Sequence, residues 1–130
     1  MRKFFATRVR SFGYAFAGWW HVIRSQRNAW IHATATVLVV LVSLWLRLER
    51  RDWVLIILAI TIVWAAEFIN TALEAVVDLA SNHQQHELAR VSKDVGAAAV
   101  LIAALASILV GLLVLGPPLI EKIKLVIGDQ

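Results

Sequence analysis

The 130-residue chain contains no cysteine. Disulfide bridges, thiolate metal sites and cysteine nucleophiles are therefore excluded, and the compartment cannot be read from redox chemistry. A Walker phosphate loop is also missing, because Gly13 and Gly18 have the right separation but are not followed by a lysine and a hydroxyl residue. No G-x-S-x-G elbow and no protein-kinase signature occurs either. The templates of soluble enzymes do not apply to this chain.

Charged residues are scarce, at 17% of the chain, whereas 60% of the residues are hydrophobic. With a mean hydropathy of +0.72, this composition indicates a membrane protein rather than a soluble domain. A hydrocarbon core about 30 Å thick needs roughly 20 mostly apolar residues per helix. Three stretches meet this condition, and we expect helices at residues 29–46, 53–77 and 94–115. The sequence predicts one all-α membrane domain with three transmembrane helices.

Residues 1–28 mix aromatic side chains with lysine and arginine, a composition typical of an amphipathic helix lying in the membrane interface. A cytoplasmic tail packed on the bundle would use the same aromatic residues. Gly13 and Gly18 each cost about 1 kcal/mol relative to alanine inside a helix, so a kink near Gly18 is compatible with the sequence.

Two prolines follow the third span directly. Pro117 and Pro118 remove backbone donors and clash with the preceding turn. We therefore expect the third transmembrane helix to end at Gly116 and residues 116–130 to form a C-terminal tail.

Basic residues indicate the orientation. Six lysines and arginines precede the first span and two lie between the second and third, against five on the opposite side. The positive-inside bias places the N-terminus and the 79–94 loop in the cytoplasm. We expect an integral protein of the cytoplasmic, or inner, membrane. The sequence pI of about 10.1 is better explained by topology and anionic headgroups than by nucleic acid, which we do not expect as a partner.

The segment EFINTALEAVVD, residues 67–78, places polar groups inside the second span. At 100° per residue, four of them share one stripe: Glu67, Asn70, Glu74 and Asp78. A carboxylate in hydrocarbon costs at least a few kcal/mol, so Glu67 should face protein or water, where it can accept a proton from a hydroxyl at the membrane surface. Glu74 and Asp78 lie closer to water and can hold Mg²⁺ through their oxygens.

Lys93 and Asp94 open the third span at the same membrane depth. The ammonium of Lys93 can offset phosphate charge, and the carboxylate of Asp94 can bind metal or orient the lysine. A purely structural role for these groups, as bonds between neighbouring helices, is the alternative. Four aligned polar groups that face a lysine and an aspartate favour a phosphoryl-transfer site. We expect His32 to be a hydrogen-bonded residue at the membrane interface.

Two motifs resemble one known family. These are E-x-x-N-T-A-L-E-A-V-V-D at residues 67–78 and H-E-L-A-R-V-S-K-D-V-G-A-A-A-V-L-I at residues 86–102. They are similar to the prokaryotic diacylglycerol kinase and undecaprenol kinase family, and the resemblance runs from about Phe12 to Leu115. It implies a small membrane homotrimer, with three transmembrane helices and an amphipathic N-terminal helix per subunit. Such enzymes transfer the γ-phosphate of MgATP to a lipid hydroxyl.

The resemblance also implies residue roles. Glu67 would be the catalytic base and Glu74 a metal ligand. The neighbours that order nucleotide and metal would be Asn70, Asp78, Lys93 and Asp94, and the family contacts nucleotide at the positions of Tyr14 and His86. Small residues at the start of the third span permit close helix approach, which suits a trimer whose active sites are shared between subunits.

One position departs from the family pattern. Gln26 stands where the family usually has a glutamate that helps to bind metal, and a neutral amide should bind Mg²⁺ more weakly. The pattern R-N-x-x-x-H, from Arg27 to His32, resembles the undecaprenol kinase branch, so undecaprenol is slightly preferred to diacylglycerol as substrate. The alternative is a catalytically weakened or inactive lipid-binding or regulatory member. A cation path along the acidic stripe ranks last, because the charges cluster near one membrane face.

Overall fold

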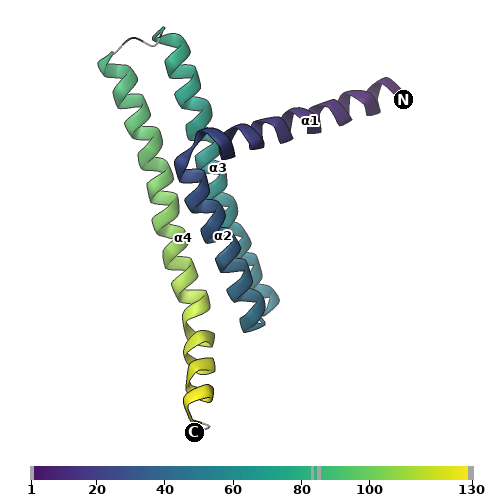
Figure 1. Ribbon diagram of the computed structural model, residues 1–130, viewed down its shortest axis with the longest axis vertical. Helices are drawn as coiled ribbons and strands as arrows, with labels where there is room; N and C mark the ends of the chain where they lie inside the picture. The colour runs from purple at the N-terminus through teal and green to yellow at the C-terminus, as the bar shows by residue number, and fades with distance from the viewer. Residues whose placement is uncertain (1, 83, 85, 129–130) are drawn as a thin grey trace.

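The computed structural model describes residues 2–82, 84 and 86–128, without the side chains of residues 2–7 and 9. This part of the chain contains no strand and forms four helices: α1 (Arg2–Ser25), α2 (Arg27–Leu46), α3 (Arg50–Ala80) and α4 (Glu87–Gly128). The last three run side by side, while α1 leaves the bundle at a steep angle (Figure 1). Among the described residues, α2, α3 and α4 are each long and apolar enough to cross a membrane. The predicted all-α architecture with three candidate spans is confirmed.

The helices of the bundle differ in length, and two of them are longer than a bilayer core requires. The 20 residues of α2 span about 30 Å, the thickness of a hydrocarbon core, whereas the 31 residues of α3 and the 42 of α4 span about 46 Å and 63 Å. The hairpin between α3 and α4 therefore projects beyond the level at which α1 joins α2 (Figure 1). At the opposite end, α4 continues past the other two helices.

Short connections set the antiparallel order. Arg47 adopts a left-handed conformation, with φ 54°, after the last turn of α2. Its N–H donates to the Leu44 carbonyl and that of Leu48 to the Ser43 carbonyl, which satisfies carbonyls that the helix end leaves open. At the end of α3, Asn82 has φ 49°, a region that asparagine tolerates better than most residues.

The predicted end of the third span at Gly116 is wrong, because α4 runs through Pro117 and Pro118 to Gly128. Proline has a helical φ, and membrane helices accommodate its missing hydrogen bond through neighbouring groups. Beyond the prolines, the Lys122 Nζ donates to the Trp45 carbonyl over 2.7 Å and lies 4.4 Å from the centroid of the Trp45 ring. This contact holds the extension against the end of α2. Likewise, α1 passes Gly18 without a break.

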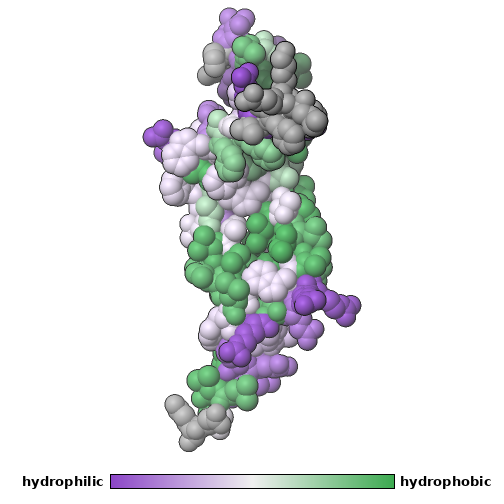
Figure 2. Space-filling model, turned by 90° about the vertical axis from the view of Figure 1, so that its right-hand side faces the viewer, coloured by the Kyte–Doolittle hydropathy of each residue, from purple (hydrophilic) through white to green (hydrophobic). Residues whose placement is uncertain are grey.

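The tightest packing lies between α3 and α4. Ile56, Ala59 and Val63 of α3 are buried, as are Val100 and Ala103 of α4. Close approach of the two helices also lets the Ser107 hydroxyl donate to the Ala59 carbonyl over 3.0 Å. Figure 2 shows an apolar surface over the middle of the bundle and a hydrophilic group of residues below it. This distribution is typical of a protein whose middle contacts hydrocarbon.

Candidate active site

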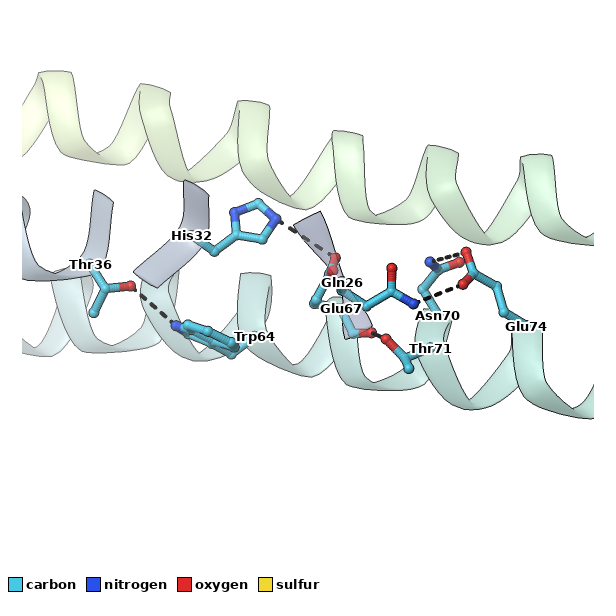
Figure 3. A network of polar contacts seen from close by, with 8 residues as sticks. All are labelled: Gln26, His32, Thr36, Trp64, Glu67, Asn70, Thr71 and Glu74. Carbon is cyan, nitrogen blue, oxygen red and sulfur yellow. Dashed lines mark hydrogen bonds and ion pairs between the residues drawn. The ribbon is translucent and has the colours of Figure 1, made fainter. Parts of the chain in front are cut away.

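Glu67 lies on the face of α3 that is turned into the bundle, and only 1% of the residue is exposed. As the cost of a lipid-facing carboxylate predicts, it faces protein. Its Oε2 lies 3.7 Å from the Nε2 of His32 on α2 (Figure 3). That separation is too long for a hydrogen bond, and neither atom has another hydrogen-bond partner. The carboxylate is therefore buried with one oxygen unused.

Glu74 lies two turns further along α3, and both of its carboxylate oxygens accept hydrogen bonds from amides (Figure 3). The Gln26 Nε2 donates to Oε2 and the Asn70 Nδ2 donates to Oε1, each over 3.0 Å. Gln26 lies between α1 and α2, so this contact ties the start of α2 to α3. The two amides hold the half-buried carboxylate in one orientation.

Asn70 is itself held by α4. Its Oδ1 is buried without a hydrogen-bond partner and packs against Gly96. A Cβ at Gly96 would collide with this oxygen and press on a methyl group of Leu73, 3.2 Å away. Gly96 therefore leaves the space in which the amide of Asn70 lies while it donates to Glu74.

The third polar contact of this face lies at the α3–α4 hairpin. The Lys93 Nζ of α4 donates to the Asp78 Oδ1 of α3, and both side chains are partly exposed. They line an open pocket of about 580 Å³, to which His86 and Arg90 also contribute. His86 accepts a hydrogen bond at Nδ1 from the Leu88 N–H at the start of α4. The volume falls within the range of small-molecule sites.

These residues are ordered along the bundle axis. Because Gln26 bonds to Glu74, the level of the α1–α2 junction lies at Glu74. At about 1.5 Å per residue of helix, Glu67 lies roughly 10 Å to the bundle side of this level and Asp78 roughly 6 Å to the hairpin side. The candidate site is a column of polar groups that runs from a buried carboxylate to an open pocket.

Two predicted site residues stay outside this column in a single chain. Asp94 is exposed and pairs with Arg90 one turn earlier on α4, at 3.4 Å. Tyr14 is 70% exposed on α1, twelve residues before Gln26 and thus about 18 Å away along the helix. Among the described residues, no three histidine, aspartate or glutamate side chains gather closely enough to hold a metal ion.

His32 is the residue whose position sequence reasoning missed. It was expected as a hydrogen-bonded interfacial residue, but it points at Glu67 without a hydrogen bond at Nε2. Trp64 of α3 lies beside it, with ring centroids 6.4 Å apart, and donates a hydrogen bond to the Thr36 hydroxyl over 3.1 Å. Trp64 also contacts Trp19 of α1, with centroids 5.9 Å apart. These contacts fix the wall of the site next to the buried carboxylate.

Known proteins resemble the chain over most of its length. A family model described as prokaryotic diacylglycerol kinase matches residues 13–115. A diacylglycerol kinase of Synechocystis sp. is 43% identical over 111 residues, which cover 85% of this chain but 63% of that protein, less than two thirds of its length. The undecaprenol kinase of Bacillus subtilis is 36% identical over 110 residues, 85% of this chain and 89% of that protein. The diacylglycerol kinase of Escherichia coli is 33% identical over 112 residues, 81% and 85% of the two chains.

Proposed function

Because the chain belongs to the prokaryotic diacylglycerol kinase family, we propose that it transfers the γ-phosphate of ATP to the hydroxyl of a membrane lipid. Membership confirms the resemblance of residues 67–78 and 86–102. The names of the relatives support a lipid kinase, with ATP as the phosphoryl donor. Undecaprenol is the slightly preferred acceptor and diacylglycerol the next, as the pattern of Arg27, Asn28 and His32 indicates.

The observation that carries this proposal is the column from Glu67 to the hairpin pocket. Its buried end has an unused carboxylate oxygen, roughly 10 Å from Glu74 along α3 on the side of the apolar spans. Its open end has a lysine in a pocket large enough for part of a nucleotide. A phosphoryl transfer between a lipid and ATP needs both, because one reactant comes from the bilayer and the other from water.

Glu67 acts as the general base in this scheme. The hydroxyl O–H bond breaks and its proton goes to the Glu67 carboxylate, while the oxygen electron pair forms a bond to the γ-phosphorus. The bond from the γ-phosphorus to the β–γ bridging oxygen breaks, and ADP leaves on the hairpin side. Lys93 offsets phosphate charge there, and Asp78 orients its ammonium. Positioning and charge neutralisation supply most of the rate in such reactions.

The residues around Glu74 fit Mg²⁺ by their chemistry. A carboxylate flanked by the amides of Gln26 and Asn70 offers hard oxygen donors, and Glu74 is half-buried, so it can be reached from one side. Glu74 and Gln26 would hold the ion, and Asn70 would order it with the nucleotide. When bound, Mg²⁺ neutralises charge on the phosphates. The neutral Gln26 weakens this site relative to one with a second carboxylate.

We place the protein in the inner membrane as a homotrimer that shares its active sites between subunits. The exposed positions of Asp94 and Tyr14 support this assembly, since within one chain neither reaches Glu74. The small, exposed residues 97–99 of α4 offer a face for close helix approach. The steep angle of α1 to the bundle supports an interfacial helix (Figure 1). The basic residues favour a cytoplasmic N-terminus and hairpin.

A catalytically weakened lipid-binding member of the family is the second candidate. Gln26 favours it, because the amide removes a negative charge from the metal site. The ion pair of Asp94 with Arg90 also engages a carboxylate that the resemblance assigns to the ordering of nucleotide and metal.

Phosphate transfer in mixed micelles tests the proposal. The purified protein is incubated with labelled ATP, Mg²⁺ and either undecaprenol or diacylglycerol. We expect label in the lipid, with a preference of a few-fold for undecaprenol, and a loss of about a hundredfold for Glu74→Gln. Glu121→Gln is the matched control, because Glu121 is an exposed acid outside the site. Lipid binding without turnover would favour the second candidate, and equal rates for the two variants would remove Glu74 from the site.

A further inference from the structure

Glu67 Oε2 and His32 Nε2 are two of the buried polar atoms that lack a hydrogen-bond partner among the described residues. They face each other across 3.7 Å from different helices. Buried polar groups in folded proteins nearly always have a partner, and one that lacks it requires an explanation. Since the two atoms lie too far apart to satisfy each other, a third group that contacts both would complete the site.

The chemistry of that third group follows from the two atoms. A carboxylate oxygen only accepts, and an imidazole nitrogen that carries its proton only donates. A hydroxyl matches both, because it donates through its hydrogen and accepts on its oxygen. An oxygen atom about 2.8 Å from each of two atoms that are 3.7 Å apart satisfies the usual hydrogen-bond lengths.

We propose that His32 and Glu67 together form the binding position for the hydroxyl of the lipid acceptor. The inference rests on the proposed function and adds His32 to it as a residue that contacts the reacting oxygen. The imidazole N–H holds the oxygen while the carboxylate takes the proton. The substrate class is a membrane lipid with a free alcohol, since Glu67 lies roughly 10 Å deeper than Glu74, on the side of the apolar spans.

The surroundings of His32 keep the imidazole in place. Trp64 lies edge-on to it and is fixed by its own hydrogen bond to Thr36 one turn further along α2. The His32 side chain is 14% exposed, against 1% for Glu67. The imidazole side chain thus reaches the outside of the chain at one edge, whereas the carboxylate does not.

Steady-state kinetics of two variants of similar size test this position. His32→Met removes the donor, and we expect kcat to fall about a hundredfold and the KM for the lipid to rise, with the KM for ATP changed by less than about twofold. His32→Gln retains an N–H donor and should recover to within about tenfold of the wild type. Thr34→Val is the matched control: it removes an exposed hydroxyl of the same helix that donates to the Trp30 carbonyl one turn earlier, and its rate should stay within about twofold of the wild type.

A measurement on the wild type makes the test independent of variant folding. The methyl ether of the lipid alcohol can accept a hydrogen bond from His32, whereas the corresponding hydrocarbon cannot. We expect the ether to inhibit about tenfold more strongly. Equal inhibition, or His32→Met kinetics equal to the wild type, overturns the inference. A wild-type protein that phosphorylates neither lipid overturns the proposed function itself.

Discussion

The two halves of the α3–α4 pair differ in their contacts, which are mainly apolar in one half and mainly polar in the other. Towards the C-terminal end of α4, Ile56 and Ala59 of α3 are buried, and the Ser107 hydroxyl of α4 donates a hydrogen bond to the Ala59 carbonyl. Towards the hairpin, the contacts are polar: the Asn70 amide donates to Glu74 within α3, and the Lys93 ammonium of α4 donates to Asp78 of α3. All the buried side-chain atoms without a partner in the described part of the chain lie in this second half, on α3 or on α2 beside it. An unpaired buried polar group costs about 1–3 kcal/mol, so the first half stabilises the pair while the second half contains groups that lower its stability. This cost is expected of a half that binds the ligands of the proposed reaction.

The largest expected effects come from one substitution in each half, which should change activity in one case and stability in the other. Glu67→Gln should lower kcat about a thousandfold, because the proposed general base is lost, without lowering the unfolding temperature, because a buried carboxylate is removed. Ile56→Ala should cost about 2–4 kcal/mol of stability through the cavity it leaves, and keep its kcat at low temperature. Initial rates and tryptophan-monitored thermal unfolding in detergent measure both. A folded but inactive Ile56→Ala protein would contradict the division.

A smaller effect is expected from the glycines of α4. Gly96→Ala places a methyl group on the Asn70 Oδ1, so the amide must move away from Glu74. We expect activity to fall about thirtyfold, with a higher Mg²⁺ requirement. Gly111→Ala is the matched control on the same helix, because its methyl group meets no atom within 4 Å. It should keep full activity and gain up to about 1 kcal/mol of stability. Equal activities for the two variants would mean that Asn70 does not position Glu74.

The smallest effect is a gain at the α1–α2 junction. Gln26→Glu places a second carboxylate beside Glu74. Without metal the two charges repel, so the unfolding temperature should fall; with Mg²⁺ it should rise, and half-maximal activity should need about tenfold less Mg²⁺. Magnesium titrations of activity and of thermal unfolding measure these changes. If neither titration differs from that of the wild type, residue 26 does not contribute to a metal site.

The sequence predicted what depends on composition and on a single helical stripe. Three spans follow from hydropathy, and the inward face of α3 follows from Glu67, which cannot be left in lipid. The inward face of α2 could not be read in this way. A membrane helix is apolar towards both lipid and protein, so its hydrophobic periodicity does not show which side is buried, and the approach of His32 to Glu67 could not be predicted.

Two other differences have separate causes. Adjacent residues on a helix point about 100° apart, so Lys93 and Asp94 could not both face Asp78, and the sequence contained that information. The run of α4 through Pro117 and Pro118 was not visible, because it is held by Lys122 on the end of α2. That contact joins residues 77 positions apart, and no local rule detects it.

In the proposed reaction, the level of Glu74 at the α1–α2 junction separates two substrates whose concentrations are measured differently. The nucleotide would reach the hairpin side from solution, so its concentration is a molarity. The lipid acceptor would reach the bundle side from the membrane, so its concentration is a mole fraction of the lipids. Diluting the acceptor with inert lipid should therefore slow the proposed enzyme even when the total amount of acceptor in the tube is unchanged, whereas added buffer should slow it only through ATP.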